Sequence, residues 1–319
     1  MRPTRLLAAV VLAATSLYAV PAAAAPAASV ADAPWSVEPA DNAFGPDRQN
    51  YTYTVAPGDT VDDGLLVVNR GTTPLELAVY AADGFTTDSG QLDLRRKDAK
   101  STSVGAWVRP SRNAVTVLPG KAASVPFTVR VPADAAPGDH IGGIVTSVEQ
   151  TDPASKQPVE QRMGVRIKLR VGGELKPQLT VSDVHVHPSL VGGDATVTYT
   201  VHNTGNATVS ARQKASLAGP FGQLRAESGE VADSPSLLPG DSWKASVPVR
   251  DVAAVVPLSA EVTVVPLLTD AAGSTAPLAA VSGEAHGRVL PVILLAVLLV
   301  LAGGAVVVRR RSRREIVGG

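Results

Sequence analysis

Apolar and polar residues alternate in short runs along most of the chain. Tyr51–Val55 is such a run, and the turn residues Pro57, Gly58 and Asp59 follow it. A period of two residues bounded by Gly, Pro, Asn and Asp is typical of β-strands joined by tight turns. Similar runs occupy 64–69, 75–80, 114–118, 124–131, 143–148 and 164–171. The pattern therefore predicts strands and turns, with no helical periodicity between 34 and 268.

The spacing of these runs indicates a fold class. Seven short strands within about 140 residues are typical of an immunoglobulin-like β-sandwich. We therefore predict an all-β protein whose first sandwich covers residues 34–172, with a boundary at Gly172-Gly173.

A weak internal repeat predicts a second immunoglobulin-like sandwich over 173–268. Leu66–Gly71 and Thr200–Gly205 both end in Asn-x-Gly, and each is followed by a Leu-Pro-Gly turn, at 118–120 and 238–240. Asn-x-Gly turns are common in β proteins, so chance recurrence is the alternative. Two paired marks in the same order favour duplication.

The two ends of the chain predict its topology. Residues 1–28 combine Arg2 and Arg5 with an apolar stretch and small residues, which is typical of a cleaved secretory signal peptide. An N-terminal membrane anchor is the alternative, but the apolar stretch is short for one.

Residues 289–308 form a run of 20 without a charged side chain, long enough for a transmembrane helix. Five arginines follow in the tail 309–319, which predicts a cytoplasmic tail and extracellular N-terminal domains. Residues 269–287 are rich in Ala, Gly, Ser and Pro and predict a flexible stalk.

Charge and composition narrow the function. The chain carries 29 basic and 29 acidic side chains, but residues 26–287 hold 21 basic against 28 acidic ones, a net charge of −7. An acidic exterior disfavours nucleic acid as a partner. The absence of cysteine excludes disulfides and Cys-ligated metal sites.

No sequence motif for catalysis occurs, so we expect neither an enzyme nor a cofactor. His185 and His187 share one face of a predicted strand, but no third metal ligand has suitable spacing. The acidic stretch 83–93 resembles a calcium loop only loosely, because it lacks the order of ligands in an EF-hand. A solvated strand face and an exposed turn are the favoured interpretations, and no metal is expected.

Aromatic residues near a polar insertion are the remaining candidates for a ligand site. Phe85 and Trp107 bracket the insertion, and Asp83, Asp88 and Arg109 lie close to them in sequence. An aromatic ring beside hydrogen-bonding groups commonly holds a sugar or a peptide. The alternative is that Trp107 packs in the core of the sandwich.

Several marks of the first domain together resemble a known family, the WxL-interacting proteins of Gram-positive cell surfaces, in their DUF916 peptidoglycan-binding domain. The resemblance covers about residues 34–171. Its most specific element is Gly-Asp-His-Ile-Gly-Gly-Ile at 138–144, and the other marks are Trp35–Pro39, Val55–Gly58, 82–92, Leu118–Gly120 and Val131-Pro132.

This resemblance implies a membrane-anchored cell-surface protein that binds peptidoglycan or another wall component, with the second sandwich as a spacer or partner-binding module. The alternative that we carry forward is an assembly module of chaperone type. Such a module would capture a secreted or surface protein by adding a strand of that protein to an exposed sheet edge.

Overall fold

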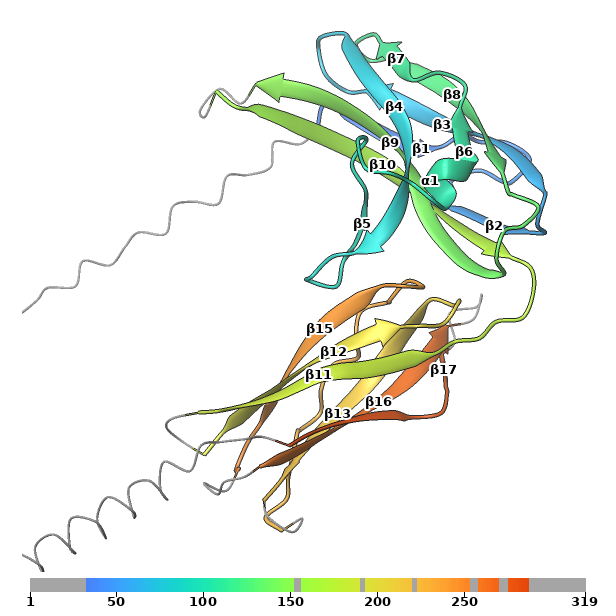
Figure 1. The fold of residues 1–319 in the computed structure, drawn as a ribbon. Coiled ribbons are helices and arrows are strands. Elements are labelled where there is room, and N and C mark those ends of the chain that lie inside the picture. Colours follow the sequence, from blue (N-terminus) through green and yellow to red (C-terminus); the bar gives the residue numbers. More distant parts are fainter. Residues whose placement is uncertain are drawn as a thin grey trace, which may run out of the picture. The chain divides into compact units, whose positions relative to one another are not determined.

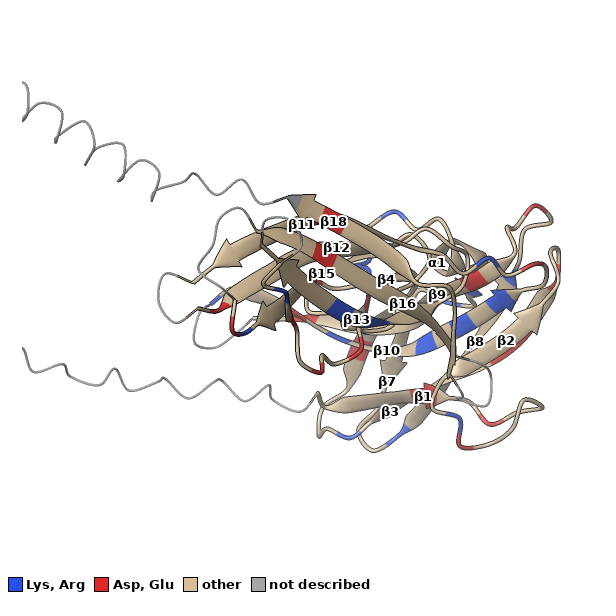
Figure 2. Ribbon diagram, turned by 90° about the horizontal axis from the view of Figure 1, so that it is seen from below, with Lys and Arg blue, Asp and Glu red and all other residues tan. Residues whose placement is uncertain are grey.

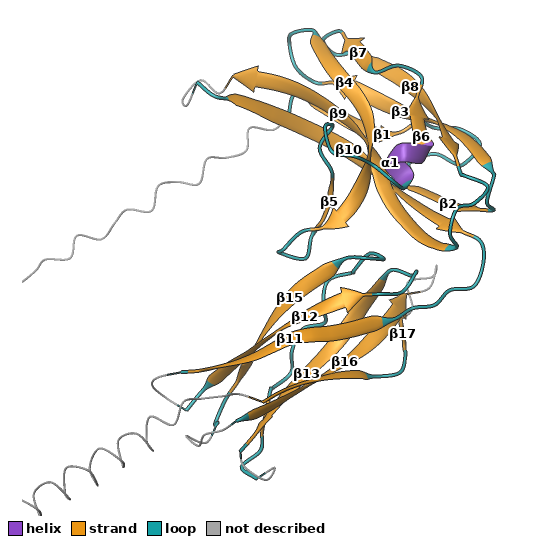
Figure 3. Cartoon of the chain, viewed as in Figure 1, coloured by secondary structure: helices purple, strands orange, loops and turns teal. Residues whose placement is uncertain are grey.

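The computed structural model describes residues 33–151, 156–189, 193–219, 223–252, 258–269 and 275–286. It confirms an all-β, immunoglobulin-like fold (Figures 1 and 3). One short helix, α1 (Val104–Trp107), interrupts the strands in the region that the sequence analysis described as a polar insertion.

The first sandwich consists of two sheets (Figure 1). The first sheet has the order β1 (Trp35–Pro39), β3 (Thr60–Asn69), β8 (Ala122–Arg130) and β6 (Val108–Pro110). The second has the order β2 (Tyr51–Val55), β10 (Pro158–Val171), β9 (Gly138–Thr151), β4 (Leu75–Thr86) and β5 (Leu92–Leu94), and β7 (Ala114–Val117) also pairs with β4.

The core of this sandwich follows from the alternation in the sequence. In β2 the residues Tyr51, Tyr53 and Val55 are buried and the two threonines between them are exposed. Since a strand turns successive side chains to opposite faces, each strand contributes one apolar row to the interior. The largest fully buried side chains of the first sandwich are Trp35, Tyr51, Leu65, Leu77, Ile144, Ile167 and Leu169.

The strands β9 and β10 are much longer than the predicted runs 143–148 and 164–171. They pair in antiparallel register from Gly138–Val171 to Thr151–Pro158. The half of each strand next to the β9–β10 connection, up to Thr151 and from Pro158, carries many polar side chains. The apolar pattern in the sequence therefore marked only the halves that lie in the core.

The second sandwich also has two sheets. One contains β11 (Leu179–Pro188), β12 (Ala195–Asn203) and β15 (Ser242–Val249). The other contains β14 (Ala226–Glu227), β13 (Val209–Ala218), β16 (Ser259–Thr269) and β17 (Thr275–Pro277), and β18 (Val281–His286) also pairs with β16.

The stretch 269–287, for which the sequence predicts a flexible stalk, supplies β17 and β18 instead. Both pair with β16, in which apolar residues predominate. The small residues have a packing role, because a Cβ atom on Gly283 would lie 2.7 Å from Cγ1 of Val181. The prediction of flexibility was therefore wrong for β17 and β18, because the small side chains there serve close packing.

The internal repeat is confirmed in atomic detail. Asn69 and Asn203 are both fully buried, and each closes its Asn-x-Gly turn by accepting a bond from the glycine N–H, at 2.8 and 3.0 Å. Each amide group also donates two hydrogen bonds to backbone carbonyls, which belong to Thr73 and Val117 for Asn69 and to Ala207 and Leu237 for Asn203.

The Leu-Pro-Gly turns occupy equivalent positions as well. The N–H of Gly120 bonds to the carbonyl of Asn69 at 3.0 Å, and that of Gly240 bonds to the carbonyl of Asn203 at 2.9 Å. A buried asparagine therefore joins the same two turns in both sandwiches.

Three predicted segments lie outside the described residues: the signal peptide 1–28, the transmembrane helix 289–308 and the basic tail 309–319. Among the residues that the structure does describe, no helix has the length and apolar character needed to cross a membrane.

Candidate functional site

The predicted site residue Asp83 has a structural role. Its side chain lies at the end of β4 and accepts hydrogen bonds from the backbone N–H groups of Thr102, Ser103 and Gly105, at 2.6, 3.1 and 2.7 Å. Asp83 is only 8% exposed. The carboxylate therefore orders the turn that leads into α1, and these bonds occupy both of its oxygens.

The other four predicted residues are distributed over separate places. The Phe85 ring packs against the guanidinium of Arg95 at 5.3 Å, and the Trp107 ring lies 4.7 Å from the ring of His140. Both aromatic side chains are partly exposed, whereas Asp88 and Arg109 are exposed on other segments, a hairpin turn and β6. Ligand binding by these residues stays a prediction.

The segment after β4 forms a strap over the outer face of the second sheet. Leu94 packs there on Tyr80, Ala82 and Val145. Gly143 leaves room for it, because a Cβ atom at this position would lie 2.5 Å from Cδ1 of Leu94. An open depression of about 870 Å³ lies between the strap and the sheet. Its lining carries both acidic and basic side chains, among them Glu76, Arg96, Lys97, Asp98, Glu149 and Glu160.

The strap is also connected to β10. Arg162 donates a hydrogen bond to the carbonyl of Leu94 at 3.0 Å, and its second terminal nitrogen lies 3.6 Å from Asp93. The outer face of β10 is therefore held next to the strap, while one edge of β10 remains available.

That edge is the most prominent unpaired feature of the first sandwich. β10 pairs along its whole length with β9, but β2 covers its opposite edge only from Ile167 to Val171. Within the part of the chain that the structure describes, residues 158–166 therefore pair on one side only. This stretch is named here the β10 slot.

The β10 slot carries an alternating pattern. Val159, Gln161, Met163 and Val165 share the face that continues the core, and Val159 is 46% exposed. A strand edge with exposed apolar side chains is a template for pairing with another chain. The pattern is not evident in the sequence, because Gln161 and the charged residues interrupt the apolar run.

Trp35 lies where the buried core of the first sandwich ends, beside the β10 slot. It is 1% exposed, and its Nε1–H donates a 2.8 Å hydrogen bond to Oγ1 of Thr146, which in turn donates to the Met163 carbonyl at 3.2 Å. Val165 is buried, whereas Met163 and Gln161 are partly exposed and Val159 is exposed. The apolar row thus runs out of the core and into solvent.

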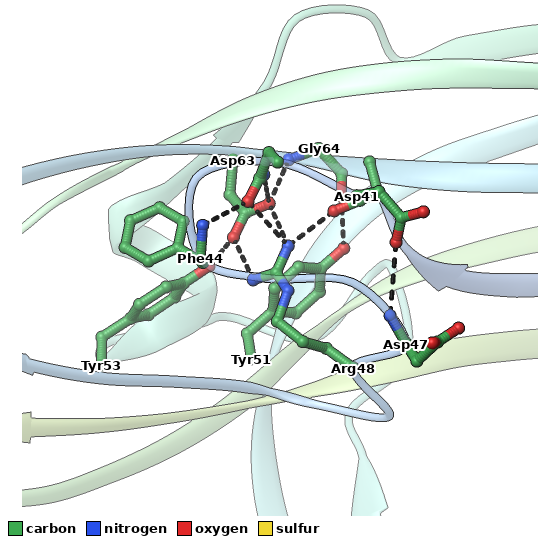
Figure 4. A network of polar contacts seen from close by, with 10 residues as sticks. Asp41, Phe44, Asp47, Arg48, Tyr51, Tyr53, Asp63 and Gly64 are labelled. Carbon is green, nitrogen blue, oxygen red and sulfur yellow. Dashed lines mark hydrogen bonds and ion pairs between the residues drawn. The ribbon is translucent and has the colours of Figure 1, made fainter.

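A buried polar network determines where β2 begins and therefore where the slot ends (Figure 4). Arg48, just before β2, forms two hydrogen bonds with the carboxylate of Asp63 on β3, at 2.7 and 3.0 Å. Asn42 and Tyr53 donate to the same carboxylate at 2.6 and 2.7 Å. The Tyr51 hydroxyl bonds to the carbonyl of Gly64 at 2.7 Å.

These contacts hold the loop between β1 and β2 against the first sheet. The chain therefore passes from β1 in one sheet to β2 in the other, and β2 meets β10 only at Ile167. The sequence offered no local signal for this network, because Arg48 and Asp63 lie 15 positions apart.

The network also shifts proton affinities. Burial alone would raise the pKa of Asp63, but hydrogen bonds from Arg48, Tyr53, Gly64 and Asn42 outweigh it and hold that pKa below its ordinary value. Burial, followed by the interaction with Asp63, raises the pKa of Tyr53 far above its ordinary value. The network is therefore complete when the carboxyl is ionised and the phenol is neutral.

Two edges of the second sandwich, those of β13 and β15, are less receptive. After the two-residue strand β14, residues 228–237 follow the edge of β13 without forming a regular strand, and the hydroxyls of Ser228 and Ser234 accept the N–H groups of Ala215 and Ala211. The edge strand β15 contains Pro248, which has no N–H group to donate.

The metal alternatives find no support. The rings of His185 and His187 lie 6.5 Å apart on one strand, as the alternation predicts. Among the described residues, no three His, Asp or Glu side chains are grouped in a way that could hold a metal ion.

No protein-family model and no curated protein matches the chain, so membership of the WxL-interacting family stays a prediction. Solved structures do match. A chain from a chaperone–tip adhesin complex of CFA/I fimbriae biogenesis has 7% identity and a TM-score of 0.39, and the match covers 80% of this chain and 99% of that one.

Two further matches are also described as chaperones. The CupB2 chaperone of Pseudomonas aeruginosa has 13% identity and a TM-score of 0.31, with 75% of this chain and 97% of that one covered. The Csu chaperone–tip adhesion subunit complex of Acinetobacter baumannii has 11% identity and a TM-score of 0.34, with 72% and 94% covered.

These findings contradict the expected peptidoglycan binding. These three matches are described as chaperones or chaperone complexes, two of them with a tip adhesin or tip adhesion subunit, and nothing found points to a wall-glycan-binding protein. We therefore do not retain that function. At such identities and TM-scores, the matches indicate a likeness of fold only and assign no activity to this chain.

Proposed function

We propose that this chain is a non-enzymatic binding protein that captures an extended segment of another protein by strand addition at the β10 slot. One observation carries the proposal: β10 is paired on both sides from 167 to 171 and on one side only from 158 to 166. An added strand would continue the line of β2 along the same edge.

Backbone hydrogen bonds supply the affinity in this mode of binding, and side chains supply the selection. Each net hydrogen bond contributes about 1 kcal/mol, so several along the slot give binding that tolerates different sequences. The exposed side chain of Val159 and the partly exposed side chain of Met163 favour apolar residues at alternate positions of the partner, because burial in both chains removes apolar surface from water.

The slot also limits the length of the captured segment. Its nine residues span about 30 Å in extended conformation. At one end it meets Tyr51, the first residue of β2, which the Arg48–Asp63 network holds in place.

The proposal places this binding outside the cell, on the strength of the sequence alone. The predicted signal peptide and the predicted span 289–308 would leave the first sandwich extracellular and tethered to the membrane. The second sandwich would then act as a spacer or as a second protein-binding module.

The test uses displayed random nine-residue peptides, which are selected on the purified full chain and then synthesised. Hydrogen exchange should show new protection at residues 158–166 when a selected peptide binds. Val159→Lys should weaken binding at least about tenfold, because an inward-pointing charge blocks strand addition.

Leu118→Lys is the matched control, since Leu118 is also an exposed apolar residue, at 58%, but lies in a turn away from β10. This variant should bind as the wild type does. Protection at another edge, or equal binding by Val159→Lys, would show that the slot is not the site.

A further inference from the structure

The β10 slot carries opposite charges at its two ends. Residues 160, 162, 164 and 166 point to the outer face of the sheet, opposite to the apolar row. Glu160 lies at the end near the hairpin turn, and Arg166 lies at the end next to β2. Figure 2 shows Lys and Arg residues following one another along part of β10.

The acidic end is reinforced by its neighbour. Glu160 lies directly opposite Glu149 on β9, and neither forms an ion pair with a described residue, although Arg96 and Lys97 of the strap line the same depression. Like charges opposite one another in a sheet are destabilising, so a cation placed beside them by a partner would relieve the repulsion.

The basic end contains two cations that stay available. Arg166 and Lys168 face the same side, and within the described residues neither forms an ion pair. Their neighbours along the strand differ, because Arg162 contacts Asp93 and Arg170 forms a 2.6 Å pair with Asp139. Within the slot itself, the outward-facing charges without an ion pair to a described residue are therefore Glu160 at one end and Arg166 at the other, and Lys168 adds a positive charge just beyond Arg166.

The inward-facing row of the slot contains one polar residue, Gln161. The Oε1 atom of Gln161 is buried and accepts no hydrogen bond from any described residue. A buried acceptor without a donor is unfavourable, and a donor on an added strand would satisfy it.

We infer that the captured segment is a dipolar strand, with an acidic residue that pairs with Arg166 and a basic residue six positions away that pairs with Glu160. Residues at the alternate positions would be apolar, except for a hydrogen-bond donor beside Gln161. This inference rests on the proposed strand capture and specifies the chemistry of the partner.

The test measures the affinity of the full chain for four synthetic nine-residue peptides of one alternating Val/Thr sequence. They carry Asp and Lys, two Asp, two Lys, or two Thr at the same pair of outward positions, six residues apart. The Asp/Lys peptide should bind about tenfold more tightly than either like-charged peptide, since each cross-strand ion pair gains and each like pair loses a fraction of a kcal/mol.

Charge reversal of the protein should change the preference in a defined way. With Glu160→Lys both ends are basic, and the two-Asp peptide should become the tightest. With Arg166→Glu both ends are acidic, and the two-Lys peptide should become the tightest. The differences should shrink in high salt, because exposed charges are screened.

Two failures are distinguishable. Equal binding of all four peptides, lost on Val159→Lys, would overturn the dipolar strand and leave strand capture standing. Binding of none of the four, together with no protection of residues 158–166 by any selected peptide, would overturn both proposals.

Discussion

At the scale of single residues, buried polar side chains determine the local geometry of this protein. Asp63 and Asn69 stand on the same strand, and each joins segments that are distant in sequence. Apolar packing is tolerant of small shifts, whereas a buried carboxylate or amide requires its partners at defined positions. These residues therefore specify the loop paths around a generic apolar core.

Asp63→Asn should destabilise the first sandwich strongly. The substitution removes the charge that neutralises Arg48, whose side chain is only 15% exposed. Breaking one partner of a buried ion pair costs about 3 kcal/mol or more. Urea denaturation of the full chain would measure this loss. Asp62→Asn is the control, because Asp62 is exposed on the same strand, and a change below about 0.5 kcal/mol is expected there.

The effect of Asp63 should depend on pH. The pKa of Asp63 is lower in the folded state than its ordinary value of 3.8, so its contribution is present above that value and is lost as the pH falls through the folded-state pKa. The stability difference between wild type and Asp63→Asn should thus shrink below about pH 4. A difference that stays constant from pH 7 to pH 3 would contradict this assignment.

At the scale of elements, the strap after β4 is ordered by side-chain contacts and not by regular pairing. Its only strand, β5, has three residues, and α1 has four. Asp83 and Leu94 therefore provide much of what holds it, one by accepting backbone N–H groups and the other by packing beside Gly143.

Asp83→Ala should cost about 2 kcal/mol in unfolding free energy, because backbone N–H groups near α1 lose their acceptor. Asp88→Ala, in the exposed turn of the same segment, should cost less than about 0.5 kcal/mol. Equal effects in urea titrations would exclude the structural role that the contacts of Asp83 indicate.

At the scale of the whole molecule, two sandwiches repeat one design and differ in their edges. The first leaves one edge of β10 unpaired over residues 158–166, whereas in the second residues 226–237 cover the edge of β13. The β10 slot in the first sandwich is consistent with a division between capture by that sandwich and support by the second.

Asn203→Ala should separate capture by the first sandwich from support by the second. It removes the two hydrogen bonds that the amide donates to the carbonyls of Ala207 and Leu237 and the one that it accepts from the N–H of Gly205, at a cost of about 2 kcal/mol to the second sandwich. Hydrogen exchange should accelerate in β11–β18, while peptide affinity at the β10 slot stays unchanged. Loss of peptide binding in this variant would show that the second sandwich takes part in capture.

The sequence by itself determined the fold class, because a period of two residues bounded by turn residues leaves few alternatives to β-sandwiches. It also located the repeat, since Asn203 and Gly205 match Asn69 and Gly71 letter for letter. Local patterns of this kind are visible because strands and turns are specified by neighbouring residues.

Only the tertiary structure decided which edge is open and which polar residues are structural. The pairing of β2 with 167–171 depends on the contact between Arg48 and Asp63, and the role of Asp83 depends on the N–H groups of residues 102–105. The stretch 275–286 shows the same limit, because it becomes strand only through pairing with β16. Contacts between distant segments leave no local pattern, so the candidate site could not be predicted from the sequence.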